Sequence, residues 1–279
     1  MLLEVASKLL SESLLSLYPS IVRNIPVAME LQMWSRFIAY VGISVFFINL
    51  DFVKVQLLSS VGLQLSLITI AHVFASYQGF AHLESGVSYT IFYLYPVFIL
   101  LMAGEAIHPI MGLGILGVVL LSLDGENETD KTKTKWYGRF MILLAALSEA
   151  MIYFLVRRMK TTNNWNHIFI SYFFGAVLGT GLFYDKIKRV LSLEQGAALV
   201  GGSALTLSLA LNGVIGLAGY LLRFFAISRL EPRIYAPLSY FGIVMAYVYG
   251  VLINGDKITA AKIAGTLCVL APNIYLITK

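Results

Sequence analysis

One apolar run follows another along almost the whole chain, with only short polar interruptions. Hydrophobic residues make up 58% of the 279 residues, and charged residues make up 13%, which is half of the about 25% typical of soluble domains. The runs are continuous rather than alternating, which favours transmembrane helices of roughly 20 residues over the strands of a β-barrel. The sequence therefore predicts an all-α membrane protein that crosses the bilayer many times.

The positions of these runs predict ten helices in two sets of five. The polar segment DGENETDKTKTK (Asp124–Lys135) separates a first set (residues 1–123) from a second set (residues 137–279), with the linker at residues 124–136. The expected helices are Val5–Arg23, Met29–Ile48, Leu58–Phe80, Gly86–Met102, Pro109–Leu123, Tyr137–Val156, Trp165–Tyr184, Ala204–Ile227, Arg233–Ile253 and Thr259–Ile277.

The two sets share short sequence matches. GEAIHPIMGLG (Gly104–Gly114) resembles GDKITAAKIAG (Gly255–Gly265), and GFAHLESGVSYTIFYLYP resembles FAISRLEPRIYAPLSYFG. Because each set holds an odd number of helices, the second set must cross the membrane in the opposite direction to the first. Inverted repeats of this kind place a substrate site at their interface, near the bilayer midplane. The expected architecture is ten transmembrane helices, arranged as two inverted five-helix repeats around a central cavity.

These features resemble the drug/metabolite transporter superfamily, and in particular its EamA-type members. The resemblance covers nearly the whole chain and is carried by YLYPVFILLMAGE, RFFAISRLEPRIYAPLSY and GDKITAAKIAGTLCVL. Asp256 stands where the family more often has glutamate, and the lysine-rich signatures of nucleotide-sugar carriers are not evident, which disfavours that substrate class. The resemblance implies a multi-pass secondary transporter with cytosolic termini.

Four charged residues fall inside predicted helices, where each costs about 2.5–3.5 kcal/mol at the bilayer centre. Glu12 and Glu149 each follow a serine at matching positions in the two sets, and Arg36 and Arg223 lie in the second and eighth helices. Two explanations stay open. The charges either pair with one another, helped by arginines that reach towards the bilayer surface, or they form a polar cavity. In such a cavity the carboxylates bind a substrate ammonium or a coupling proton, while the arginines hold a carboxylate or phosphate.

Polar stripes and tyrosines mark further candidates. The third helix carries Ser66, Thr69, His72 and Ser76 on one face, and the eighth carries Ser208, Asn212, Gly216, Gly219 and Arg223. Small and hydroxyl residues also serve helix packing, so His72 and Asn212 are the members kept as candidates. Tyr95 and Tyr235 are interpreted as interface residues, whereas mid-span tyrosines suit a flat or cationic ligand. The candidate substrate-binding residues are Glu12, Arg36, His72, Tyr89, Tyr93, Glu149, Asn212, Arg223 and Tyr240.

The ends of the helices carry other expectations. Pro19, Pro96 and Pro237 each remove a helical hydrogen bond and permit bends. Glu105 and Asp256 are expected to stabilise the N-termini of the fifth and tenth helices. The basic residues, Lys8 and Lys262 among them, are expected to flank the bilayer, because they form no dense block suited to nucleic acid.

The expected function is a secondary transporter, an exporter or an exchanger, of a small polar metabolite that is amino-acid-like or otherwise cationic or zwitterionic. The alternative is a nucleotide-sugar or sugar-phosphate antiporter that uses Arg36 and Arg223, with Lys262 as a further candidate. Coupling to a proton, to a counter-substrate or to neither stays open, as does the choice between monomer and homodimer. The scattered histidines and the single Cys268 offer no catalytic or metal-binding set, so an intramembrane enzyme is disfavoured and no cofactor is expected.

Overall fold

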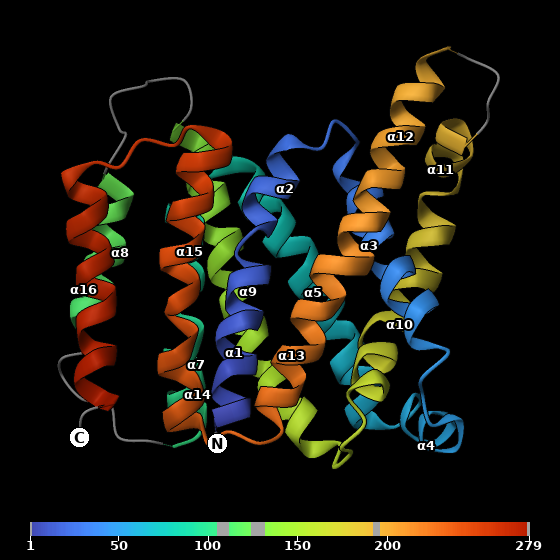
Figure 1. Ribbon diagram of the computed structural model, residues 1–279, viewed down its shortest axis with the longest axis horizontal. Coiled ribbons are helices and arrows are strands. Elements are labelled where there is room, and N and C mark those ends of the chain that lie inside the picture. Colours follow the sequence, from blue (N-terminus) through green and yellow to red (C-terminus); the bar gives the residue numbers. More distant parts are fainter. Residues whose placement is uncertain (1, 105–111, 124–131, 192–195, 278–279) are drawn as a thin grey trace.

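A computed structural model describes residues 2–104, 112–123, 132–191 and 196–277. Every element assigned in these ranges is a helix, and the helices stand side by side in one bundle (Figure 1). The start of the first helix and the end of the last helix lie on the same face of the bundle. The prediction of an all-α protein is confirmed.

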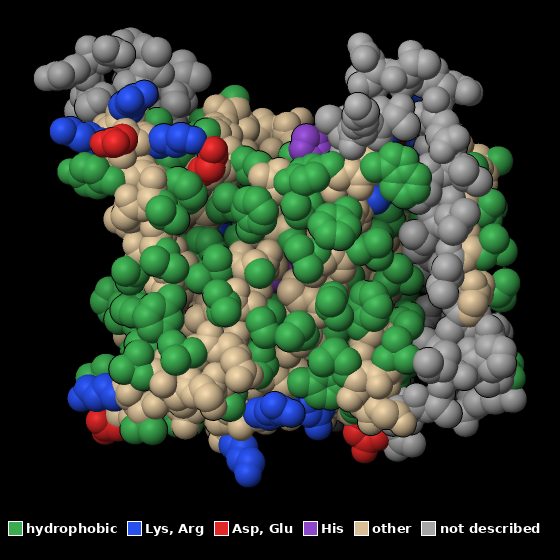
Figure 2. Space-filling view, turned by 180° about the vertical axis from the view of Figure 1, so that it is seen from behind, with side chains coloured by type: hydrophobic (Ala, Val, Ile, Leu, Met, Phe, Trp, Pro, Cys, Tyr) green, Lys and Arg blue, Asp and Glu red, His purple; other side chains and the backbone are tan. Residues whose placement is uncertain are grey.

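On the face seen in Figure 2, apolar side chains cover most of the middle of the bundle, and charged side chains gather above and below them. Two helices, Asn164–Leu182 and Tyr184–Val190, meet at a bend of 75°. If they are counted as one span, the pair is long and apolar enough to cross a membrane. The described residues thus form an integral membrane protein that crosses the bilayer several times. Five helical stretches are each long and apolar enough to span a membrane: Ser60–His82, Ser85–Met102, Lys135–Arg158, Ser203–Ile227 and Ile234–Asn254.

In the first half, each expected range contains a helix, but two of them are divided. The range Val5–Arg23 holds two helices, Gly86–Met102 holds two more, and the short helix α4 is not predicted. The elements are α1 (Leu2–Leu15), α2 (Tyr18–Asn24), α3 (Met29–Ser44), α4 (Leu50–Gln56), α5 (Ser60–His82), α6 (Ser85–Phe92), α7 (Tyr95–Met102) and α8 (Gly112–Leu123).

In the second half, α9 begins at Thr132, inside the segment predicted as a linker, and residues 124–131 lie outside the described ranges. Two short π-helical segments, η2 and η3, interrupt the helices of the eighth and ninth expected ranges. The elements are α9 (Thr132–Arg158), α10 (Asn164–Leu182), α11 (Tyr184–Leu191), α12 (Gly196–Leu211), η2 (Asn212–Gly216), α13 (Leu217–Ile227), α14 (Pro232–Ser239), α15 (Phe241–Tyr249), η3 (Gly250–Asn254) and α16 (Ala260–Ile277).

Proline explains two of the breaks. Pro19 is the second residue of α2, and Pro96 is the second residue of α7. Proline has no N–H, so a continuous helix through Pro19 would leave the carbonyl four residues earlier without its donor. That carbonyl belongs to Leu15, and it accepts a hydrogen bond from the Tyr89 hydroxyl instead. Pro237 lies in α14, which ends shortly before α15 begins.

Helices α1, α5, α9 and α13 occupy the centre of the bundle (Figure 1). On one side, α8 packs against α16 through small residues: a Cβ on Gly265 would lie 2.9 Å from the Gly117 carbonyl oxygen. Gly265 therefore serves the packing of α16 against α8. The polar stripes of the third and eighth predicted helices both face inward, with His72 and Asn212 each 2% exposed.

Candidate functional site

Two carboxylates from opposite halves of the chain converge on one guanidinium. Arg223 on α13 lies between Glu12 on α1 and Glu149 on α9. Its Nη2 is 3.1 Å from both carboxylate oxygens of Glu12, and its Nη1 is 2.8 Å from Oε1 of Glu149. All three side chains are at most 1% exposed. The two acids that the sequence places at matching positions are therefore in contact with the same cation.

Lys8 is the fourth member of this central charge cluster, which we define as Lys8, Glu12, Glu149 and Arg223. Lys8 is fully buried one turn before Glu12, and its Nζ donates to Oε1 of Glu12. The expectation that Lys8 flanks the bilayer is wrong. Its spacing of four residues from Glu12, which puts both on one helix face, was the available signal. The two negative and two positive charges of the cluster balance.

Tyr95 and Tyr235 enclose Lys8 rather than lying at the bilayer interface, which corrects their interpretation. Lys8 Nζ donates to the Tyr95 hydroxyl over 3.0 Å and lies 3.7 Å from the centroid of the Tyr235 ring. The Tyr95 hydroxyl in turn donates to Ser239 Oγ over 2.6 Å. These contacts extend the cluster to α7 and α14, the helices that flank the breaks of the fourth and ninth expected ranges.

The arginines do not reach the bilayer surface, since Arg36 is 2% exposed and Arg223 is 1% exposed. Of the two explanations offered by the sequence, ion pairing is present for Arg223 in this structure. The prediction that the acids and arginines also bind substrate is compatible with this pairing, because a ligand can exchange with an internal ion pair.

His72 on α5 extends the cluster towards a second polar region. Its Nδ1 is 3.1 Å from the carbonyl oxygen of Ala145, which only accepts, so we assign the Nδ1 proton to this bond. Its Nε2 lies 3.5 Å from Oε2 of Glu149 and 3.4 Å from the Tyr220 hydroxyl. Within the described part of the chain, Oε2 of Glu149 has no hydrogen-bond partner. A proton placed on Nε2 or on Oε2 would join these two groups.

The candidate tyrosines differ in what they contact. The Tyr93 hydroxyl donates to Oε2 of Glu12, so Tyr93 contacts the central charge cluster. The Tyr240 ring lies 6.2 Å from the Tyr93 ring, and its buried hydroxyl has no partner among the described residues. Tyr89 donates to the backbone of Leu15, so it supports the break between α1 and α2.

Arg36 on α3 forms the second polar region. Its Nη2 donates to the Tyr172 hydroxyl over 2.9 Å. The guanidinium carbon lies between 4.7 and 5.9 Å from five tyrosine ring centroids, a range typical of cation–π contacts. We name these five rings the tyrosine cage: Tyr18, Tyr40, Tyr77, Tyr172 and Tyr220.

Asn212 joins the cage to the eighth predicted helix. It begins η2, and the wider turn of a π-helix is common at functional positions. Its Oδ1 accepts from the Tyr18 hydroxyl over 2.6 Å, while its Nδ2 donates to Ser35 Oγ over 3.0 Å and to the Ser208 carbonyl over 2.9 Å. All its polar atoms are therefore used, and Asn212 positions the cage.

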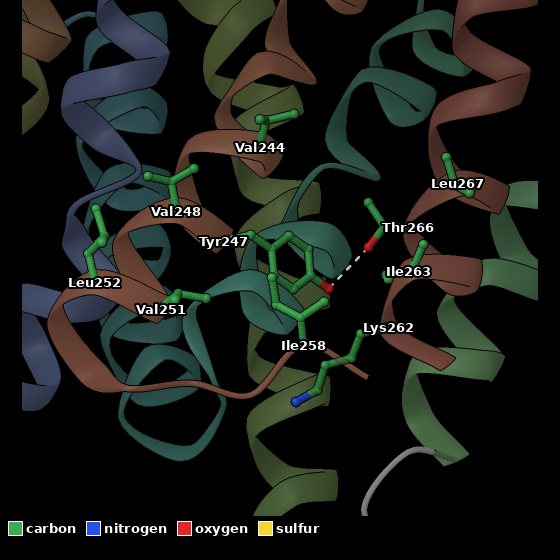
Figure 3. A pocket seen from close by; sticks show the side chains of 10 residues that line it. All are labelled: Val244, Tyr247, Val248, Val251, Leu252, Ile258, Lys262, Ile263, Thr266 and Leu267. Atoms are coloured by element: carbon green, nitrogen blue, oxygen red, sulfur yellow. Dashed lines mark hydrogen bonds between the residues drawn. The ribbon is translucent and has the colours of Figure 1, made fainter. Parts of the chain in front are cut away.

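The space between the two polar regions is almost closed. A cavity of about 10 Å³, room for about one water molecule, lies between Arg36, Arg223, His72 and Tyr220. The central cavity expected from the sequence is thus filled by side chains in this structure. A groove of about 480 Å³ lies instead on the outer surface between α15, η3 and α16, and its lining is largely apolar (Figure 3).

A network of polar side chains lies at one face of the bundle, and we name it the polar seal: Ser20, Arg23, Ser85, Asn254 and Asp256. Arg23 Nη1 lies 2.9 and 3.0 Å from the two carboxylate oxygens of Asp256, and the Ser85 amide donates to Asp256 over 3.0 Å. Asn254 Nδ2 donates to Ser20 Oγ over 3.0 Å and to Ser85 Oγ over 2.8 Å. The seal ties α2, α6 and η3 together at the face opposite the chain ends.

Asp256 and Lys262 differ from their predicted roles. The Asp256 carboxylate binds the first turn of α6 and not of α16, which begins at Ala260. Lys262 is 5% exposed, and its Nζ contacts the Glu84 carboxylate and the Lys257 carbonyl instead of reaching the surface. Glu105, the counterpart of Asp256, lies outside the described residues.

The described residues contain no group of three or more His, Cys, Asp or Glu side chains placed to hold a metal ion. A search of curated proteins finds no match. A protein known from its crystal structure has a similar fold, with a TM-score of 0.57 over 99% of this chain and 97% of that chain, and 16% identical residues. The model of the EamA-like transporter family matches residues 136–277, which is more than half of the chain. The chain therefore belongs to the EamA-like transporter family, within the drug/metabolite transporter superfamily.

Proposed function

We propose that this protein is a secondary transporter that moves a small polar metabolite by alternating access. The carrying observation is the central charge cluster, in which Glu12 and Glu149 share Arg223 at the centre of an apolar bundle. Buried ions are expensive in a membrane and mark substrate or ion pathways when they are retained. Family membership supports transport as the activity on which these charges act.

We further propose ten transmembrane helices in two inverted repeats. Support comes from the matched segments that begin with Gly104 and Gly255. Both glycines have positive φ, +78° and +67°, and both lie just after a helical segment: Gly104 two residues after the last residue of α7, and Gly255 directly after η3. Such a backbone favours glycine, which explains why it recurs at this point in both halves.

The packing of the helices supports the same relation. If α1 corresponds to α9 and α5 to α13, then the contact between α1 and α13 should recur as a contact between α9 and α5, and both pairs pack together. Likewise α1 packs on α14 and α15, while α9 packs on α7 and α6. The pairs α3 with α10 and α8 with α16 join counterparts directly. These pairings support the proposed inverted repeat.

The contacts of the serine before each glutamate support the same relation between the two halves. Ser11 Oγ donates to the Gly219 carbonyl over 2.8 Å, and Ser148 Oγ lies 3.2 Å from Nδ1 of His72. Alignment of Leu83-Glu84 with Leu230-Glu231 makes His72 the counterpart of Gly219. The two serines therefore contact matching positions on matching helices, which supports a site shared by two related halves.

The charge balance favours a zwitterionic, amino-acid-like substrate over a simple cation. Glu12 and Glu149 are already compensated by Lys8 and Arg223. A bound cation would leave the buried cluster with uncompensated positive charge, whereas a zwitterion brings its own anion. A sugar phosphate is the alternative, and it would engage the arginines.

For coupling, we propose that a proton binds between His72 and Glu149. The Nε2 and Oε2 atoms face each other over 3.5 Å, and Oε2 lacks another partner in the described structure. Protonation of either group turns this contact into a hydrogen bond and weakens the hold of Glu149 on Arg223. The cluster could then loosen on one side, which alternating access requires.

The polar seal supports a closed outer face in this conformation. The resemblance to the family implies cytosolic termini, and the seal lies on the face opposite both chain ends. We propose that this seal opens when the opposite face closes.

The function is tested with purified protein in liposomes, by uptake of radiolabelled amino acids, polyamines, nucleosides, nucleotide sugars and sugar phosphates, followed by chromatography of the recovered label. We expect one class to enter chemically unchanged, and Glu149→Gln to abolish its uptake. Glu30→Gln, which changes an acid at the edge of the bundle, is the matched control and should transport normally. An altered product would identify an enzyme, and absence of uptake by folded protein for every class would overturn the proposal.

A further inference from the structure

Arg36 differs from the other two basic side chains at the centre of the bundle. Lys8 and Arg223 both contact the Glu12 carboxylate. No described carboxylate lies within ion-pair distance of Arg36, whose contacts are the five rings of the tyrosine cage. At 2% exposure it is a buried cation that has no anionic partner among the described residues. Such a charge is costly unless a counter-ion reaches it.

The tyrosine cage stabilises Arg36 without neutralising it. Ring faces attract a cation through their quadrupole, but neutral rings carry no net charge. A guanidinium stays protonated in proteins. Because the central charge cluster is balanced, Arg36 leaves the centre of the bundle with one surplus positive charge.

Arg36 also retains free donor capacity, and it lines the small cavity. Its Nη2 donates to Tyr172, whereas its Nε has no hydrogen-bond partner in the described structure. Arg36 and Arg223 line the same small cavity, with the Tyr220 ring between them at 4.7 and 5.5 Å from the two guanidinium carbons. A group bound at Arg36 therefore lies one side chain away from the central charge cluster.

We propose that Arg36 in its tyrosine cage is the subsite for an oxyanion of the substrate, a carboxylate or a phosphate. The guanidinium fork matches either group with two parallel hydrogen bonds. In a zwitterion, the ammonium group then points towards Oε2 of Glu149. This assignment rests on the proposed transport function and narrows its substrate class, because it excludes compounds that lack an anionic group.

The test uses matched ligands that differ only in this group. The thermal midpoint of the purified protein is measured with leucine, leucinamide and isoamylamine, with phenylalanine and its amide, and with glucose 6-phosphate and glucose. A ligand that binds the folded state raises the midpoint, and the shift grows with the logarithm of its concentration once it exceeds Kd. We expect a shift only with members that carry an oxyanion, and the carboxylate and phosphate arms identify which oxyanion it is.

Variants at the subsite sharpen the result. Arg36→Lys keeps the charge but removes the fork, so we expect the apparent Kd to rise about tenfold, which corresponds to the loss of one good interaction. Tyr172→Phe keeps Arg36 but removes its partner, and should weaken binding by a smaller factor. Lys54→Met, at a side chain that is 66% exposed, is the control and should bind normally.

Specific outcomes overturn the assignment. Amides and amines that shift the midpoint as strongly as the acids would show that no oxyanion is recognised. Folded Arg36→Lys protein with unchanged affinity would show that Arg36 is only a packing element. Uptake of cations or neutral solutes that is insensitive to Arg36 would overturn the subsite but keep the transporter, whereas absence of all uptake by folded protein would overturn transport itself.

Discussion

At the scale of single residues, the centre of the molecule depends on a shared cation. Arg223 compensates Glu12 and Glu149 at once, over 2.8–3.1 Å. In an apolar surrounding, removal of one charged side chain leaves its partners buried without a counter-ion, because water does not replace it. The energetic effect of a substitution here should therefore exceed that of a pair at the surface.

Arg223→Met should lower the free energy of unfolding by about 3–5 kcal/mol, the cost of breaking a buried pair. Lys186→Met removes a more exposed pair, whose Nζ lies 2.7 Å from Oε1 of Glu30, and should cost about 0–1 kcal/mol. Thermal or denaturant unfolding of the detergent-solubilised protein measures both. Equal effects would show that the cluster contributes no more than a surface pair.

Gly242 is required by the close approach of Tyr93 and Glu12. A Cβ at this position would overlap the Tyr93 hydroxyl and lie 3.0 Å from Oε2 of Glu12. Gly242→Ala should lower the thermal midpoint and reduce uptake. Gly42→Ala, where a Cβ would meet nothing within 4 Å, should be neutral or stabilise α3 by up to about 1 kcal/mol. A Gly242→Ala protein with normal stability and uptake would contradict this packing.

The proton site between His72 and Glu149 predicts a shared pH dependence. His72→Asn should flatten the pH profile of transport, and Glu149→Gln, in which uptake is lost, should flatten the pH profile of ligand binding, because each variant removes one of the two groups proposed to hold the proton. Glu30→Gln should keep the profile of the unmodified protein. If Glu149→Gln leaves the profile and the activity unchanged, the proton is not bound here.

At the scale of elements, several residues of the site lie where a helix is broken or changes to a π-helix. Tyr93 and Tyr240 lie at the breaks of α6–α7 and α14–α15, and Asn212 begins the π-helical η2. At Pro19, the freed carbonyl of Leu15 is satisfied by Tyr89 on a different helix. Tyr89 is predicted to bind substrate, and in the structure its hydroxyl donates to the backbone at this break.

Pro19 and Tyr89 should be coupled. Tyr89→Phe leaves the Leu15 carbonyl without a donor, at a cost of about 1–3 kcal/mol in unfolding free energy. In a Pro19→Ala background the cost should be smaller, because the alanine amide can reach the same carbonyl. Unfolding of the two single variants and the double variant tests this. Additive effects would show that the two residues act independently.

The sequence predicted the helices and the buried acids, because hydropathy and the cost of burying charge act locally. It predicted that Pro19 and Pro237 permit bends, but it did not predict that the first and ninth expected helices divide near them, at Ser16 and Tyr240. It placed Lys8 at the membrane edge, because a lysine near a chain end usually lies there, and only its pairing with Glu12 explains its burial. The tyrosine cage joins residues from α2, α3, α5, α10 and α13, an arrangement that no local pattern specifies.

At the scale of the whole molecule, the polar seal holds the face opposite the chain ends. The polar seal joins three elements through the Arg23–Asp256 pair, at 2.9 Å. Since Asp256 also binds the Ser85 amide, Asp256→Asn should weaken both contacts and open this face more often. Hydrogen exchange in α2 and at the start of α6 should increase in this variant. Unchanged exchange would show that the seal does not hold the face closed.

Alternating access is the central claim, and the most direct test is the accessibility of a single thiol in the small cavity. Ser76 lines this cavity and is 2% exposed. In a Cys268→Ser background, Ser76→Cys protein in vesicles is treated with a membrane-impermeant maleimide from either side. We predict labelling from both sides, slowed by bound substrate, and faster labelling through the seal in Asp256→Asn. Labelling from one side only, under every ligand condition, would contradict the account.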